Sequence, residues 1–121
     1  MTRILIVDDD FEVLALLEDI VSSLGYEVRT TTSGEVAVAL VHAFQPGVVL
    51  LDLVMPSPDG AEVLARLRRI DPELPVIMIA AQMTPDVAER LLAGGAFAYL
   101  EKPFVIGDVA ALVRAALADR A

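Results

Sequence analysis

The sequence predicts an α/β fold in which a parallel five-stranded sheet is covered by helices on both faces. Two observations lead to this prediction. Strand-length runs alternate with longer segments of helical periodicity along the whole chain, giving five β–α pairs. Hydrophobic residues also make up 56% of the 121 residues, a high share that fits a sheet buried on both faces.

The first β–α pair is bounded by clear signals. An apolar run covers residues 3–7 and stops at the acidic residues 8–10. Five apolar residues then recur at three- to four-residue spacing, which predicts one buried face of a helix. They are Val13, Leu16, Leu17, Ile20 and Leu24. Gly25 follows, and it is expected to end that helix.

The remaining elements are bounded by capping residues, glycine and proline. A mixed segment, 27–30, predicts an outer strand, and the other predicted strands are 48–51, 76–79 and 97–100. The predicted helices run from cap residues 32–35 to about 44, from 59 to about 70, from 84 to the glycines at 94 and 95, and from about 107 to 118. Continuous alternation predicts parallel neighbours joined by crossover helices.

Composition and charge narrow the class of function. The length suits one domain, and the net charge of −9, with 9 basic and 18 acidic residues, argues against direct nucleic-acid binding, which needs a basic face. No apolar run reaches the ~20 residues of a membrane span, and a secretory leader pattern is absent. Cysteine is also absent, so we expect a cytoplasmic protein without disulfides.

The chemistry is predicted at one edge of the sheet, because sites in open α/β sheets form outside the carboxyl ends of the strands. Asp8 and Asp9 follow the first strand, Asp52 follows the third, and Lys102, the one lysine of the chain, follows the fifth. Each of these residues alone is commonly a cap or a solvated loop residue. Together, three converging carboxylates favour a hard cation such as Mg²⁺, and the lysine favours a phosphate group.

Four stretches, in their order and spacing, resemble the receiver domain of bacterial response regulators, the phospho-accepting half of two-component signalling. They are 4–10, 51–56, 59–60 and 99–104, and the likeness extends over residues 1–121. The resemblance implies one receiver domain with a flavodoxin-like (βα)5 three-layer sandwich and the strand order 2-1-3-4-5. It also implies a signalling switch rather than an enzyme, one that catalyses only its own phosphorylation and dephosphorylation.

The resemblance further implies a role for each matching residue. Asp52 resembles the phosphoacceptor, which takes a phosphoryl group from a sensor histidine kinase or a His-phosphotransfer protein. Asp8 and Asp9 resemble the acidic pair that holds Mg²⁺ together with Asp52 and the main-chain carbonyl of Val54. Lys102 resembles the lysine that contacts the phosphoryl group, and its bond to the following proline is expected to be cis.

One position departs from the family pattern. The family places Thr or Ser at the end of the fourth strand, where its hydroxyl bonds the phosphoryl group, and this chain has Ala80. A hydrogen bond to a charged group is worth roughly 1.5–3 kcal/mol, so we expect phosphorylation to survive and switching to weaken. Tyr99 resembles the aromatic switch residue. Its ring either turns inward only slightly on phosphorylation or, beside the small Ala80, rests inward at all times. Gln82 and Thr84 are less favoured substitute donors.

Several interpretations of partners and function stay open. The resemblance implies an output domain or a homodimer through the fourth helix, fifth strand and last helix, while composition and charge predict no membrane contact and no direct nucleic-acid contact. A pseudo-receiver that works without phosphorylation is one alternative, because of Ala80. A haloacid-dehalogenase-type phosphatase fits the spacing of Asp8 and Asp10, but residues 80–82 lack the acidic pair it needs. Flavodoxin would need a phosphate loop where residues 8–10 are acidic.

Overall fold

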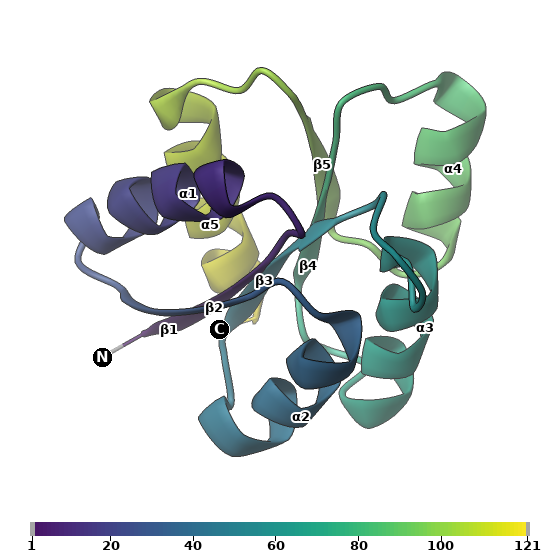
Figure 1. The fold of residues 1–121 in the computed structure, drawn as a ribbon, viewed down its shortest axis with the longest axis horizontal. Helices are drawn as coiled ribbons and strands as arrows, with labels where there is room; N and C mark the ends of the chain where they lie inside the picture. Colours follow the sequence, from purple (N-terminus) through teal and green to yellow (C-terminus); the bar gives the residue numbers. More distant parts are fainter. Residues whose placement is uncertain (1, 121) are drawn as a thin grey trace.

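The computed structural model describes residues 2–120 and confirms the predicted three-layer α/β sandwich (Figure 1). Its sheet has five parallel strands in the order β2-β1-β3-β4-β5. The strands are β1 Arg3–Val7, β2 Glu27–Thr31, β3 Val48–Asp52, β4 Val76–Ala80 and β5 Ala98–Glu101. The helices are α1 Phe11–Ser23, α2 Gly34–Phe44, α3 Gly60–Ile70, α4 Pro85–Ala93 and α5 Ile106–Arg120.

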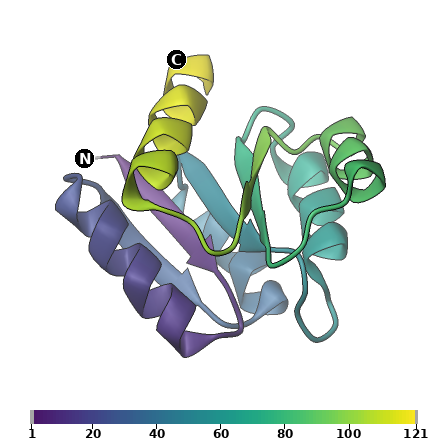
Figure 2. The ribbon, with the colours of Figure 1, turned by 90° about the horizontal axis from the view of Figure 1, so that it is seen from above.

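Two hydrophobic cores fill the space between the sheet and its helices. Because successive side chains of a strand point to opposite faces, Ile4 and Ile6 of β1 join the core under α1 and α5. Leu5 and Val7 join the core under α2, α3 and α4. In Figure 2, α1 and α5 lie on one side of the strands, and α3 and α4 lie on the other. Every residue of β3 and β4 is buried, so these two strands give a rigid base to the residues at their carboxyl ends.

The outer position of β2 is confirmed. It pairs with β1 alone, and none of its five residues is fully buried. This explains why its sequence mixes charged and apolar residues, while β3 is apolar up to its last residue, Asp52, and β4 is apolar throughout.

The buried face of α1 differs from the predicted one. The structure buries Leu14, Leu17, Ile20 and Val21, whereas Leu16 is 50% exposed. The apolar run at 13–17 allows more than one helical phase, so periodicity alone could not choose between them. The cap sets where the helix starts, because the Asp10 carboxylate accepts a hydrogen bond from the Glu12 N–H at 2.9 Å.

Side-chain caps begin the next three helices as well. Ser33 accepts from the Val36 N–H, Asp59 accepts from the Glu62 N–H, and Thr84 accepts from the Val87 N–H. The capping predicted around 32–35 and at 84 is therefore confirmed. Element ends otherwise shift by one or two residues, as is usual. Within the described residues 2–120, no helix has the length and apolar character needed to cross a bilayer.

Candidate functional site

The acidic and basic residues predicted at the strand ends lie together at one edge of the sheet. Asp52 is the last residue of β3 and pairs with Ile79 of β4. Asp8 and Asp9 come directly after β1, and Lys102 comes directly after β5. One carboxylate oxygen from each of the three aspartates lies within 4.8 Å of one from each of the others. We call these three aspartates and Lys102 the acidic site.

Two of the three carboxylates are buried, and the ammonium group reaches both. Asp8 is fully buried and Asp52 is only 4% exposed, while Asp9 is exposed. The Lys102 Nζ lies 3.2 Å from Asp8 Oδ2 and 3.6 Å from Asp52 Oδ1. Main-chain pairing places this lysine, because its N–H donates to the Ala80 carbonyl at 2.8 Å. The four residues are thus brought together by the sheet itself.

The electrostatics of the acidic site are dominated by an excess of negative charge. Burial, and then the Asp8 carboxylate, raise the pKa of Asp52 from 3.8 to about 7, although Lys102 opposes the shift. Burial alone would lower the pKa of Lys102, but the charges of Asp52 and Asp8 outweigh it and raise that pKa. Lys102 therefore stays charged at neutral pH, while Asp52 is only partly ionised there.

The donor set of the acidic site fits a magnesium ion. All three side chains offer carboxylate oxygen, the ligand that Mg²⁺ prefers. Within residues 2–120, no hydrogen bond reaches the buried Asp8 Oδ2, whose charge is met by the ion pair with Lys102. One ammonium group does not neutralise three carboxylates, and a bound cation would supply the missing positive charge. Asp8, Asp9 and Asp52 are the side chains that would hold it, and the Val54 carbonyl lies in the adjoining loop.

The two predicted switch positions lie on neighbouring strands. Ala80 is the buried last residue of β4 and pairs with Glu101, and Tyr99 of β5 pairs with Met78. Tyr99 is 42% exposed in this structure. Thr84 uses its hydroxyl oxygen to cap α4, and Gln82 is exposed. The Lys102–Pro103 bond is cis, as predicted.

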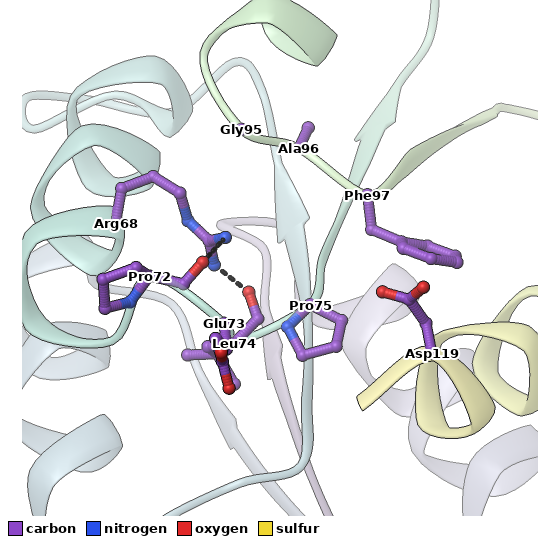
Figure 3. Close-up of a pocket in the computed structure, with 9 residues that line it drawn as sticks. All are labelled: Arg68, Pro72, Glu73, Leu74, Pro75, Gly95, Ala96, Phe97 and Asp119. Carbon is purple, nitrogen blue, oxygen red and sulfur yellow. Dashed lines mark hydrogen bonds between the residues drawn. The ribbon is translucent and has the colours of Figure 1, made fainter. Parts of the chain in front are cut away.

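A pocket lies away from the acidic site. It has a volume of about 620 Å³ and lies where β4 and β5 begin, at the opposite edge of the sheet (Figure 3). Arg68, Phe97 and Asp119 are among its lining residues, and Arg68 donates to the carbonyl of Leu74. The acidic site needs no such cavity, because a metal ion and a phosphoryl group are small and charged.

Sequence reasoning missed one residue of the site region, Gly60. In the sequence it stands out only as part of a short motif with Asp59, yet it is buried and touches the main chain at Asp52. A glycine directly after a capping aspartate was the available signal, but sequence alone gives no distance between α3 and β3.

Comparison with known proteins identifies relatives of the whole domain. The family model of the response regulator receiver domain matches residues 4–114. The transcriptional regulatory protein PrrA of Mycobacterium tuberculosis is 39% identical over 118 residues, which are 98% of this chain and 51% of PrrA. The DNA-binding transcriptional regulator NtrC of Azospirillum brasilense is 35% identical over 94% of this chain and 24% of NtrC. The chain thus spans about half the length of PrrA and about a quarter of NtrC.

Solved structures agree with the sequence matches. A response regulator receiver domain protein (CheY-like) from Methanospirillum hungatei superposes with a TM-score of 0.93 at 28% identity, covering 99% of this chain and 96% of that one. A putative response regulator from Chloroflexus aurantiacus gives a TM-score of 0.91 at 34% identity, covering 97% of this chain and 98% of its own. The likeness therefore covers the sheet and all five helices.

The raised pKa of Asp52 predicts that Asp52→Asn stabilises the metal-free protein. The pKa of Asp52 is higher in the folded chain than in the unfolded chain. Its contribution to stability is therefore complete below pH 3.8 and is lost as the pH rises from there through about 7. At pH 8 the loss is on the order of 4 kcal/mol. Urea unfolding with a chelator present should show Asp52→Asn more stable than the unmodified chain at pH 8, with the gap shrinking towards pH 5.

The control for this prediction is Glu89→Gln, which removes an exposed charge on α4. It should change the free energy of unfolding by no more than about 0.5 kcal/mol. An Asp52→Asn variant that is less stable than the unmodified chain at pH 8 would show that the acidic site is not under repulsion.

The oxygen donor set predicts that millimolar Mg²⁺ raises the melting temperature. Binding to the folded state alone adds about 2.7 kcal/mol when the free ion is at 100 times its Kd. Asp9→Ala should lose most of this shift, because it removes a ligand without opening the core. Differential scanning fluorimetry measures it, with sodium chloride at equal ionic strength as the control for screening. A full shift in Asp9→Ala would contradict the assignment.

Proposed function

The chain belongs to the response regulator receiver domain family, and from this premise we propose that it accepts a phosphoryl group on Asp52. The donor is a phosphohistidine of a sensor histidine kinase or of a His-phosphotransfer protein. The observation that carries the proposal is that the one lysine of the chain, Lys102, lies within ion-pair distance of two buried carboxylates, Asp52 and Asp8.

The proposed step is an in-line transfer to Asp52. One carboxylate oxygen attacks the phosphorus, and the new O–P bond forms as the P–N bond of the phosphohistidine breaks. The electron pair of the P–N bond returns to the ring nitrogen, and the ring, protonated at its other nitrogen, leaves as neutral imidazole. The product is an acyl phosphate on Asp52. Hydrolysis of this acyl phosphate by water returns the carboxylate, so the domain catalyses only its own phosphorylation and dephosphorylation.

Positive charge beside the carboxylate supports this step. Phosphoryl transfer spreads negative charge over three equatorial oxygens, and catalysis consists mostly of placement and neutralisation. Lys102, 3.6 Å from Asp52 Oδ1, is positioned to meet one of those oxygens. Mg²⁺, when held by Asp8, Asp9, Asp52 and the Val54 carbonyl, would supply the remaining neutralisation. Both cations also favour the ionised, attacking form of Asp52.

We propose that the surface formed by α4, β5 and α5 transmits the signal to a partner. This face exposes apolar side chains that the cores do not use: Leu92, Tyr99, Val105 and Ile106. It would contact an output domain or a second copy of the chain, while the excess of acidic residues disfavours direct nucleic-acid contact. Relatives named as transcriptional regulators are about twice as long or longer. A cytoplasmic location is part of the proposal.

We propose that phosphorylation of Asp52 is retained but that the conformational response to it is reduced. Ala80 has no hydroxyl to bond the phosphoryl group, and Thr84 lies four residues beyond the end of β4, as the N-cap of α4. The ligand-dependent preference for an inward Tyr99 ring is therefore reduced, because a ligand shifts an equilibrium only by its differential affinity. Ala80 also favours the second candidate function, a pseudo-receiver that works unphosphorylated. Direct labelling of Asp52 separates the two.

Acetyl phosphate with Mg²⁺ should add one phosphoryl group to the unmodified chain, detected by intact-mass spectrometry. Asp52→Asn should abolish the addition, and Lys102→Ala should slow it by about 100-fold, the usual effect of losing one charge-stabilising group. Asp86→Asn, at an exposed position of α4, is the matched control and should label normally. Undiminished labelling of Asp52→Asn would move the acceptor elsewhere, and no labelling at all would favour the pseudo-receiver.

Ala80→Thr should restore coupling between the acidic site and Tyr99. A hydroxyl that bonds the phosphoryl group adds up to ~2 kcal/mol, or about thirtyfold, to the preference for the inward ring. The measurement is NMR of the Tyr99 ring with and without beryllofluoride, a phosphoryl mimic. Ala80→Val is the control, because valine has the shape of threonine without its hydroxyl. A large Tyr99 movement in the unmodified chain, unchanged in Ala80→Thr, would contradict this expectation.

A further inference from the structure

The first turn of α3 lies directly against the main chain that carries Asp52, with no room for a side chain between them. Gly60, the first residue of α3, is buried. A Cβ atom added there would lie 2.3 Å from the Asp52 carbonyl oxygen and 2.6 Å from the Leu53 Cα. The Gly60 N–H also donates to the Leu53 carbonyl at 3.0 Å. All of these contacts are with backbone atoms, which cannot rotate away as a flexible side chain can.

The segment in contact with Gly60 is held from its other side as well. The Leu53 N–H donates to the Ile79 carbonyl of β4 at 2.8 Å. On the helix side, Asp59 caps α3 through the Glu62 N–H at 2.9 Å. The main chain at Asp52 and Leu53 is therefore clamped between β4 and α3, and a methyl group at position 60 would have to displace one of them.

We propose that Gly60 is a positioning residue for the acidic site. By letting α3 pack directly on the main chain of residues 52 and 53, it fixes the Asp52 carboxylate relative to Asp8 and Lys102. It also fixes the loop that carries the Val54 carbonyl. The inference rests on the proposed function, because it concerns how the chain holds the magnesium ion and phosphoacceptor named there. Gly60 acts through Asp52 and touches neither ion nor donor.

The chain offers a matched control at Gly34. This glycine is likewise the buried first residue of a helix, α2, and it is similarly crowded. A Cβ atom there would lie 2.7 Å from Val63 Cγ2 and 2.9 Å from the Pro58 carbonyl oxygen. Neither contact involves residues 52–54. A substitution at Gly34 therefore presses on α3 and on the loop before it, but it makes no direct contact with the main chain of residues 52–54.

The test compares Gly60→Ala and Gly34→Ala in the full chain. Urea unfolding reports stability, and isothermal titration with Mg²⁺ alone reports the Kd of the folded protein. Both variants should lose stability, but only Gly60→Ala should weaken Mg²⁺ binding, by about tenfold or more, as is typical when a group that orients a metal ligand is changed. Gly34→Ala should stay within about twofold of the unmodified chain. If Gly60→Ala is unfolded in buffer, trimethylamine N-oxide restores folding and all three proteins are compared in it.

The possible outcomes separate this inference from the proposed function. Normal Mg²⁺ binding by the unmodified chain with an equal Kd in Gly60→Ala overturns the role of Gly60 alone. Failure of the unmodified chain to bind Mg²⁺ overturns both. Equal weakening in the two glycine variants also overturns the role, because it would reduce Gly60 to general packing.

A measurement on the unmodified protein does not depend on any variant folding. If Gly60 packing holds the ligands, ligand occupancy must in turn hold the packing, because coupling is reciprocal. Hydrogen exchange of the Gly60 amide should therefore slow by about tenfold on saturation with Mg²⁺. The Ala37 amide in the first turn of α2, bonded to the Ser33 carbonyl at 3.0 Å, is the control and should change far less. Unchanged exchange at Gly60 overturns the inference.

Discussion

The repulsion among three carboxylates at the end of a buried sheet is the constraint on which the rest of this structure depends. Two of them, Asp8 and Asp52, are almost wholly removed from water, where like charges interact far more strongly than at a surface. The single ammonium of Lys102 reaches both but cannot balance all three. The pKa of Asp52 accordingly rises to about 7. A site with this excess of negative charge favours the binding of a cation. A bound cation could then also neutralise a phosphoryl group transferred to Asp52.

The fold keeps this unfavourable arrangement in place by burying everything beneath it. β1, β3 and β4 contribute fully buried apolar side chains to both cores, so the strand ends cannot drift apart to relieve the repulsion. Local hydrogen bonds add detail: the Asp8 carboxylate accepts from the Asp10 N–H at 2.9 Å, and the Asp8 N–H donates to the Thr31 carbonyl. Stability gained in the cores thus offsets strain at the edge, as is common where a fold supports a charged site.

The route from the acidic site to the exposed face runs over β4 and β5. Lys102 is tied to Ala80 through the main chain, while Tyr99 lies on the same strand that delivers Lys102. Lys102 thus links the acidic site to the end of β5, a strand whose Tyr99 and Glu101 are exposed while Leu100 is buried in the core. With only a methyl group at position 80, the switching that we propose would rely on Lys102 and the main chain. We therefore propose that the site supports phosphoryl transfer better than it transmits the resulting change to Tyr99.

The sequence by itself determined the β–α alternation, the burial of the central strands and the residues at the strand ends. This worked because the period of apolar residues and the carboxyl-edge rule are local or topological properties, so Asp8, Asp52 and Lys102 could be assigned to one edge without coordinates. The tertiary structure decided the helical phase of α1, where several apolar faces competed. It also decided that two of the three carboxylates are buried, that Tyr99 is partly exposed and that Gly60 packs against the main chain of Asp52. Each of these depends on distances between segments remote in the chain, and no local pattern of residues encodes such distances.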